Sequence, residues 1–339
     1  MVRLRLFFAL VAALNLASVS NAQTPEYEGP VIDMHIHAYP ADGNGPPGTP
    51  LCPNIAEFRY DGSVPWAQHL MTNILGRPCD QAIEGSLTDE ALRDETIAEM
   101  RARNVRGLLG GPADRVDDWV AAAPDLFWPA RHLNLSRDEE VSPDSLEAEF
   151  DAKQIVAISE ITNQYAGIMA DDPRMDAFWA MAERTGMPVG IHVGLGPPGT
   201  AKLYPEFRVQ HPSHLEEVLN AYPDLRLFVM HAGYPFVAEM KALLYVHPQL
   251  MVETGVLQFA LPEAEYSSFL KELVQAGFAD RIMFGSDQMN WPGAIGLGID
   301  AINRAPYLST EQKRMILHDN AARFLRLGEA ASGRQGKQH

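Results

Sequence analysis

Two histidines one residue apart, His35 and His37, carry the clearest chemical signal in the sequence. They end an apolar run, 31–37, that has the character of a β-strand. Because residues i and i+2 of a strand point to the same face, the two imidazoles should project together. Two imidazoles held next to each other can bind a metal ion. The alternative for such a pair is that one or both histidines only form hydrogen bonds.

Four later segments are also short and apolar, and each ends in a residue type that binds metal ions. They are 155–160, ending in Glu160; 188–192, ending in His192; 227–231, ending in His231; and 281–287, ending in Asp287. Parallel barrels collect such residues at the carboxyl ends of their strands, where their active sites lie. The ordered set therefore predicts a metal centre at that end of a barrel, and core packing alone would not explain it.

The elements that must position these side chains alternate between strands and helices. Expected strands cover 31–37, 105–109, 126–132, 155–160, 188–192, 226–231, 250–254 and 281–287, with helical patterns between them. Such alternation predicts an α/β fold of parallel βα units, here a (β/α)8 TIM barrel. We expect one barrel domain over 23–330, with a long Gly- and Pro-rich insertion, 38–87, after the first strand.

The ligand order resembles that of the amidohydrolase superfamily, specifically its amidohydrolase-related (amidohydrolase 2) branch. The resemblance rests on His35-x-His37, Glu160, His192, His231 and Asp287, with support from the closing segment 320–324, and it extends from about Val31 to Leu327. It implies a metal-dependent hydrolase in which His35, His37 and Asp287 bind the metal. It also implies that Asp287 is the general base toward the attacking water, a role for which its position matters before its pKa.

The resemblance leaves the number of ions open. In binuclear relatives the carboxylate that Glu160 matches bridges two ions, and the histidines matched by His192 and His231 bind the second. In mononuclear relatives, including decarboxylases, His192 matches a ligand and His231 a catalytic histidine that activates water or polarises substrate. Glu160 favours two ions, and its alternative role is to orient a ligand histidine. We expect a divalent ion, Zn²⁺, in one or two copies.

Residues next to the strand ends are placed to contact a small-molecule substrate. The insertion begins beside the proposed metal, so it is either a substrate rim or an ordered decoration of the barrel side. Candidate substrate contacts, which the chemistry itself does not require, are Tyr39, His132, Gln164, Tyr234 and Trp291.

The composition and the two ends of the chain further limit the possible functions and the cellular location. The 339 residues carry a formal net charge of −17, which argues against a nucleic-acid surface. Residues 1–22 have the basic start, short apolar stretch and small-residue cut site of a signal peptide, so we expect an exported protein, periplasmic or secreted, without a membrane span after cleavage. Cys52 and Cys79 should then form a disulfide, the alternative being two free thiols. Residues 331–339 should form a disordered tail.

These observations lead to an exported hydrolase that uses metal-activated water on an amide, ester or lactone bond. A mononuclear decarboxylase or hydratase of the same superfamily is the alternative, and it requires a basic residue for the substrate carboxylate, such as Arg59 or Arg131. A third hypothesis is a non-catalytic binder, which loss of ligands would mark, and none is lost. The substrate and the oligomeric state are left open, a homodimer being one possibility.

Overall fold

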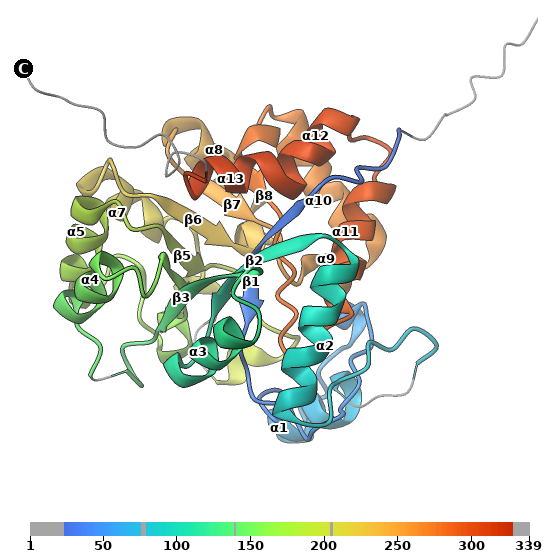
Figure 1. Ribbon diagram of the computed structural model, residues 1–339. Coiled ribbons are helices and arrows are strands. Elements are labelled where there is room, and N and C mark those ends of the chain that lie inside the picture. The colour runs from blue at the N-terminus through green and yellow to red at the C-terminus, as the bar shows by residue number, and fades with distance from the viewer. Residues whose placement is uncertain (1–23, 76–78, 139, 204–205, 328–339) are drawn as a thin grey trace, which may run out of the picture.

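Eight parallel strands form one barrel-like sheet in the computed structural model, which describes residues 24–75, 79–138, 140–203 and 206–327 (Figure 1). The expected signal peptide, 1–22, and the tail, 331–339, lie outside the described residues. Each strand pairs in parallel with the next along the chain. The strands are β1 (Val31–His37), β2 (Val105–Gly110), β3 (Phe127–Leu133), β4 (Ala157–Ile161), β5 (Val189–His192), β6 (Leu227–Met230), β7 (Met251–Glu253) and β8 (Ile282–Met283). The predicted (β/α)8 barrel is therefore confirmed.

The seam between the last and first strands differs from the expectation of a long eighth strand over 281–287. Strand β8 has only two residues, because the Phe284 N–H donates to the carbonyl of Ile316 instead of continuing a ladder. The chain still follows β1 beyond this point. Met34 donates its N–H to the Phe284 carbonyl, and Asp287 donates its N–H to the His35 carbonyl, both at 2.9 Å. These bonds close the barrel and bring Asp287 next to the histidine pair.

Asp33 reinforces the seam from inside the protein. One of its oxygen atoms, Oδ1, accepts the backbone N–H groups of His35 and Ser286, each at 2.9 Å. Its other oxygen, Oδ2, is buried without a hydrogen-bond partner among the described residues. Burial raises the pKa of Asp33 to about 7, since a charged carboxylate loses its hydration there.

We expect Asp33→Asn to change how the free energy of unfolding depends on pH. A carboxyl group whose pKa rises on folding stabilises the native state below its unfolded pKa, and this contribution is lost as pH rises through about 7. Asparagine keeps an oxygen for both N–H groups and never ionises. Between pH 5 and pH 8 the wild type should therefore lose roughly 2 kcal/mol relative to the variant. Urea unfolding of metal-free protein measures this, with Asp280→Asn on the surface as control; parallel pH curves would contradict it.

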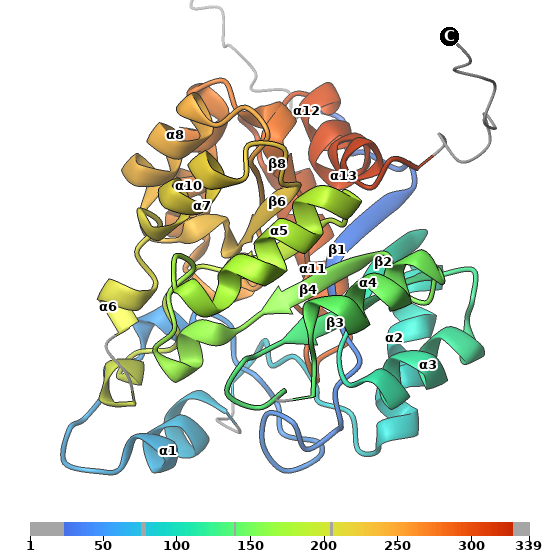
Figure 2. The ribbon, with the colours of Figure 1, turned by 90° about the vertical axis from the view of Figure 1, so that its left-hand side faces the viewer.

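The helices surround the barrel and lie between the strands, as the helical patterns predicted (Figure 2). The longer ones are α2 (Asp89–Ala102), α3 (Ala113–Ala122), α4 (Pro143–Asp151), α5 (Asp176–Thr185), α7 (His214–Ala221), α8 (Val237–Val246), α10 (Glu263–Gln275) and α11 (Ala294–Arg304). Short helices that the sequence did not predict are α1 (Trp66–His69), α6 (Glu206–Val209) and α9 (Leu257–Ala260). Among the described residues, no helix combines the length and the apolar character needed to cross a membrane.

The closing helix is divided, although the sequence predicts one helix over 310–327. It consists of α12 (Thr310–Arg314), a π-helical turn (Met315–Asp319) and α13 (Asn320–Phe324). The widened turn lies where the Ile316 carbonyl accepts the Phe284 N–H. On α13, Ala321 and Phe324 join the apolar cluster that fills the barrel interior. This helix therefore closes the end of the barrel opposite the strand carboxyl ends (Figure 1).

The insertion after β1 lies at the carboxyl ends of the strands, the position of a rim (Figure 1). It packs through its own apolar cluster, which includes Leu51 and Ile74 and reaches Phe259 and Trp291 on the barrel. Cys52 and Cys79 form the expected disulfide. The Trp66 indole N–H donates to the Pro198 carbonyl at 3.2 Å, so the insertion extends from β1 to the loop after β5.

Candidate metal centre

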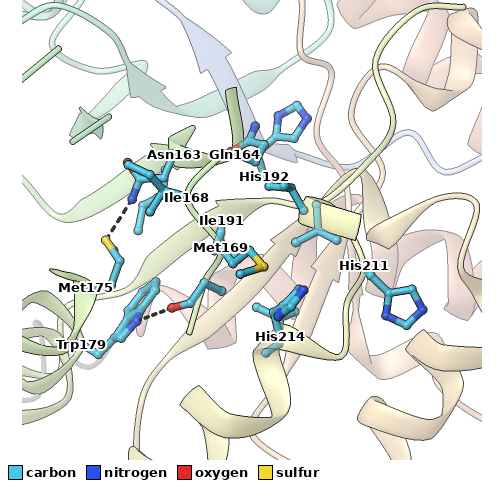
Figure 3. A pocket seen from close by; sticks show the side chains of 15 residues that line it. Asn163, Gln164, Ile168, Met169, Met175, Trp179, Ile191, His192, His211 and His214 are labelled. Carbon is cyan, nitrogen blue, oxygen red and sulfur yellow. Dashed lines mark hydrogen bonds between the residues drawn. The ribbon is translucent and has the colours of Figure 1, made fainter. Parts of the chain in front are cut away.

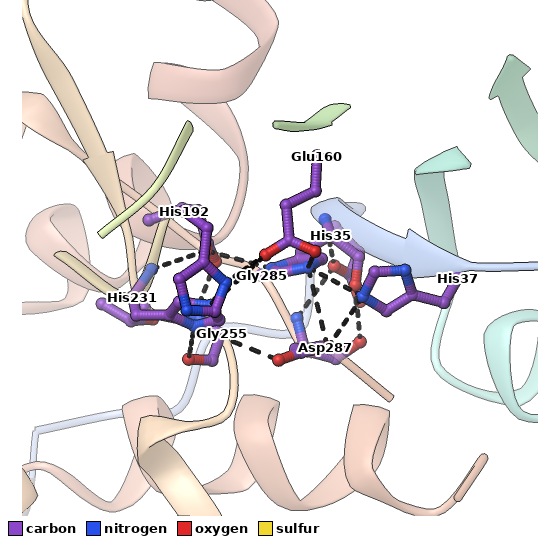
Figure 4. A network of polar contacts seen from close by, with 12 residues as sticks. His35, His37, Glu160, His192, His231, Gly255, Gly285 and Asp287 are labelled. Carbon is purple, nitrogen blue, oxygen red and sulfur yellow. Dashed lines mark hydrogen bonds and ion pairs between the residues drawn. The ribbon is translucent and has the colours of Figure 1, made fainter. Parts of the chain in front are cut away.

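Six side chains predicted to be metal ligands converge at the carboxyl ends of the strands (Figure 4). They are His35 and His37 on β1, Glu160 on β4, His192 on β5, His231 after β6 and Asp287 after β8, and all are buried. His231 and Asp287 have left-handed backbone conformations, with φ of 57° and 52°. Non-glycine residues adopt this conformation where a specific arrangement is needed, here the turn from a strand end into the barrel mouth.

One donor group consists of His35, His37 and Asp287. The two histidine Nε2 atoms are 2.9 Å apart. Asp287 Oδ1 lies 2.9 Å from Nε2 of His37 and 3.6 Å from Nε2 of His35. Two imidazole nitrogens and a carboxylate oxygen thus face one point.

The second donor group consists of Glu160, His192 and His231. His192 Nδ1 lies 2.5 Å from Glu160 Oε1 and 3.1 Å from His231 Nε2. The other oxygen of Glu160, Oε2, lies 4.0 Å from His35 Nε2 in the first group. Figure 4 shows Glu160 between the His192–His231 pair and the His35–His37 pair, so one carboxylate reaches both groups.

The hydrogen bonds behind two of these histidines fit a bound cation. His35 Nδ1 lies 3.1 Å from Glu253 Oε1, and His231 Nδ1 lies 3.0 Å from the Gly255 carbonyl. If each Nδ1 donates its proton to these oxygens, each Nε2 presents a lone pair to the centre. Imidazole nitrogens and carboxylate oxygens are the donors that Zn²⁺ takes. The residues present therefore suit a divalent ion.

The electrostatics of the cluster point the same way. Burial disfavours the ionised forms of Glu160 and Glu253, yet neighbouring histidines outweigh it and lower both pKa values. Burial opposes the charge of His35 too, but the carboxylates of Asp287 and Glu253 raise its pKa to about 10. Ionised carboxylates thus hold positive charge at the centre. A divalent ion can supply that charge in place of protons, which it releases on binding.

Glu253, at the end of β7, belongs to the centre but was not predicted from the sequence. Its Oε1 accepts the His231 backbone N–H at 2.9 Å in addition to contacting His35, and its Oε2 accepts the Gly255 N–H. It is fully buried, and a side chain at Gly285 would overlap its carboxylate. The signal was present, since 250–253 is a short apolar run that ends in a carboxylate as 155–160 does.

We expect Glu253→Gln to weaken metal binding by about 10- to 100-fold, the usual effect of removing a carboxylate that orients a ligand histidine. The Gln side chain keeps the size but loses the charge that fixes the His35 tautomer. Competition with a chelating dye measures the dissociation constant. Glu263→Gln, an exposed change on α10, is the matched control. Unchanged affinity in Glu253→Gln would show that Glu253 has only a packing role.

Three of the five candidate substrate residues lie beside the cluster. Tyr39 stacks on His37 with ring centroids 4.2 Å apart, and the His132 ring stands edge-on to His37 at 5.1 Å. Burial and the nearby Glu160 and Asp287 carboxylates raise the pKa of Tyr39, so its hydroxyl stays protonated. Burial lowers the pKa of His132 to about 3, so this imidazole stays neutral. Gln164 is buried, and its Nε2 has no hydrogen-bond partner among the described residues.

The structure does not bring Tyr234 and Trp291 to the cluster. The Tyr234 hydroxyl points to Glu265 on α10 at 3.3 Å, because the turn after His231 directs this side chain outward. Trp291 is only 2% exposed within the insertion's apolar cluster, where its indole N–H donates to the Thr49 carbonyl. Both residues were predicted because they follow a strand end closely in the sequence. That position does not determine the direction of the side chain.

A small cavity of about 20 Å³ adjoins the centre at His192 and Gln164 (Figure 3). It lies between the loops after β4 and β5 and the helices α5 and α7. Most of its wall is apolar, including Met169, Trp179 and Leu215. This cavity has room for about one water molecule next to the candidate ligands.

Comparisons with known proteins identify the family and the fold. A family model described as Amidohydrolase matches residues 32–327. Protein fluG of Emericella nidulans is 24% identical over 105 residues, which are 31% of this chain and 12% of that protein.

Solved structures that share the fold include two enzymes of known or probable activity. A probable 2-pyrone-4,6-dicarboxylic acid hydrolase from Acinetobacter baumannii, with citric acid bound, superposes with a TM-score of 0.56 at 14% identity, over 88% of this chain and 100% of that one. A dihydroxybenzoic acid decarboxylase from Polaromonas sp. JS666, with bound manganese and an inhibitor, gives 0.56 at 15% identity, over 88% and 97%. At these identities the likeness concerns the fold alone.

Proposed function

The chain belongs to the amidohydrolase family, and we propose that it is an exported metal-dependent hydrolase that cleaves an amide, ester or lactone bond of a small molecule. The observation that carries this proposal is the position of Glu160. Its Oε1 contacts His192 while its Oε2 faces His35 at 4.0 Å, as a carboxylate shared by two cation sites would. Paired ions are common in hydrolytic sites, where they hold both the attacking and the leaving oxygen.

The reaction divides its tasks among the residues of the two groups. A divalent ion held by these residues would lower the pKa of a water molecule to about 7 and would polarise a carbonyl. Burial opposes the charge of Asp287, but His35 and His37 outweigh it and lower the pKa of Asp287, which therefore remains ionised and able to accept a proton. Its Oδ2 lies 4.0 Å from His231 Nδ1, so the two catalytic candidates are neighbours, although this Nδ1 is directed to the Gly255 carbonyl.

We propose Zn²⁺ as the resident ion. Four imidazoles with carboxylates suit Zn²⁺, and imidazole with carboxylate also accepts Mn²⁺, the metal bound in the Polaromonas relative. Export is part of the proposal as well. The signal-like residues 1–22 and the Cys52–Cys79 disulfide support it, because disulfides persist mainly in oxidising compartments. Mass determination of protein recovered outside the cytoplasm should give a chain that begins after Ala22.

A panel of lactones, esters and amides tests the proposed reaction. Protein stripped with a chelator should be inactive, and Zn²⁺ or Mn²⁺ should restore hydrolysis of at least one class. The same preparations should be offered aromatic carboxylic acids, with carbon dioxide release as the measure. Carbon dioxide release without any hydrolysis would contradict the hydrolase proposal and would show that the protein is a decarboxylase.

One observation favours that second candidate. Glu160 Oε1 is close enough to His192 Nδ1 to act only as the carboxylate that orients this histidine, which would leave a single ion. A decarboxylase also needs a cation for the substrate carboxylate. Arg131 is directed to α4, where its Nε donates to Glu149 at 2.7 Å, although its Nη1 is buried without a partner among the described residues, and Arg59 is exposed on the insertion. The support for the hydrolase is therefore the position of Glu160 between His192 and His35.

A further inference from the structure

Tyr39 lies beside the candidate metal ligands without being one of them. Its ring stacks on the His37 imidazole, with centroids 4.2 Å apart and an angle of 16° between the ring planes. It also stands edge-on to the His132 ring, with centroids 5.7 Å apart. Burial, and then the charges of the Glu160 and Asp287 carboxylates, raise the pKa of Tyr39. The phenol therefore adjoins residues of both donor groups.

The backbone on both sides of Tyr39 is fixed to the barrel. The Ala38 N–H donates to the Gly110 carbonyl on β2 at 2.8 Å, and the Pro40 carbonyl accepts the side-chain amide of Asn290 at 2.6 Å. The proline ring also restricts the residue before it to extended conformations. The Tyr39 side chain is thus held in position before a substrate arrives.

The hydroxyl of Tyr39 has no hydrogen-bond partner in the part of the chain that the structure describes, and the side chain is only half-buried. Other tyrosines use their hydroxyls within the protein. Tyr60 donates to the Val64 carbonyl at 2.7 Å, and Tyr222 donates to the Asp176 carbonyl at 3.1 Å. A tyrosine hydroxyl carries a proton at neutral pH and can donate it in one hydrogen bond. Beside the ligand cluster, this donor is available to an oxygen atom of the substrate.

We propose that Tyr39 is a catalytic residue whose hydroxyl donates a hydrogen bond to the substrate carbonyl oxygen as that oxygen becomes negatively charged. This role rests on the proposed function, because it adds a donor to the same reaction. The oxygen of a water molecule adds to the carbonyl carbon, the C=O π electrons move onto the carbonyl oxygen, and Asp287 takes a proton from the water. Tyr39 keeps its own proton. The C=O bond forms again as the C–N or C–O bond breaks, and the leaving atom takes the proton held by Asp287.

A donor in this position acts mainly on the transition state. An oxyanion is a stronger hydrogen-bond acceptor than a neutral carbonyl oxygen, and a donor that is already in place needs no reorganisation as the charge develops. An oxyanion has three lone pairs, so its oxygen can contact an ion and the hydroxyl together. Loss of the hydroxyl should therefore lower kcat and leave KM nearly unchanged.

Tyr39→Phe removes the hydroxyl while keeping the ring that stacks on His37. In zinc-loaded protein lacking residues 1–22, this change should lower kcat by about 10²-fold, the usual effect of losing one such donor, without changing the zinc content. Tyr245→Phe, which removes a hydroxyl from an exposed side chain on α8, is the matched control and should keep full activity. If Tyr39 only supports the His37 ring, kcat will be unchanged in Tyr39→Phe, and the proposal fails.

Binding of methylphosphonate, a tetrahedral oxyanion, tests the same donor without a reaction. It is titrated calorimetrically into the zinc-loaded wild type and both variants, after thermal melting has verified that each is folded. Hydrogen bonds to charged groups are strong, so Tyr39→Phe should bind methylphosphonate at least about tenfold more weakly than the wild type and Tyr245→Phe. Equal affinity in Tyr39→Phe, or no binding to the wild type, would overturn the proposal. If binding weakens as expected but no ester, lactone or amide is hydrolysed, the proposed function fails and the oxyanion contact of Tyr39 stands.

Discussion

Asp287→Asn should reduce kcat/KM by at least about 10³-fold in zinc-loaded protein. The substitution keeps the size of the side chain and its bonds to the barrel seam, but it removes the negative charge and the proton-accepting oxygen. General base catalysis alone contributes about 10²- to 10⁴-fold, and loss of a ligand charge adds to it. Initial rates on whichever substrate the hydrolase screen identifies, with zinc content determined on the same sample, measure the effect.

Asp280→Asn is the matched control, because Asp280 is exposed just before β8 and has no contact with the centre. It should keep full activity. Undiminished turnover in a folded, zinc-loaded Asp287→Asn protein would remove Asp287 from the catalytic set. A loss of zinc together with activity would mean that its main role is to hold the ion, and readdition of excess Zn²⁺ separates the two roles.

Glu160→Gln should reduce the metal content from about two ions per chain to one or fewer. A carboxylate offers two anionic oxygens, and in this structure they face His192 and His35 on opposite sides. The amide of glutamine offers one neutral oxygen and cannot serve both groups. Elemental analysis of protein purified without chelator and reconstituted with Zn²⁺ gives the stoichiometry, and kcat/KM should fall by at least about 10²-fold.

Glu272→Gln is the control for this experiment, because Glu272 pairs with Lys241 at the surface. It should bind the same number of ions as the wild type. One ion in the wild type that persists in Glu160→Gln would show that Glu160 only orients His192, and the decarboxylase alternative would then gain support. Absence of tightly bound metal from the wild type would contradict the whole site.

Much of the fold could be predicted because its signals are local. Strand β1 has the predicted bounds, and the seven other strands overlap their predicted segments. The largest difference is at the seam, where the predicted 281–287 strand keeps regular pairing only at Ile282–Met283. The reason is a contact with Ile316, more than thirty residues away in sequence. No pattern within 281–287 could reveal that the Phe284 N–H would donate to the Ile316 carbonyl instead of to a strand partner.

The candidate site also contains some residues that local sequence patterns could predict and others that they could not. Glu253 carries the same local signal as Glu160, so the sequence contained it. The outward direction of Tyr234 and the burial of Trp291 depend on α10 and the insertion, and no local pattern describes these neighbours. Gln164 Nε2, which has no partner in the part of the chain that the structure describes, and the small cavity beside it arise from the packing of two loops against two helices.

The sequence by itself determined which ligand types stand at which strand ends, because strand periodicity and turn position are properties of short segments. Only the tertiary structure decided how these ends meet. Barrel closure brings Asp287 to the His35–His37 pair, and the order of the strands around the barrel puts Glu160 between the two donor groups. These distances depend on the register of strands distant in sequence. That register is settled by the packing of the whole barrel.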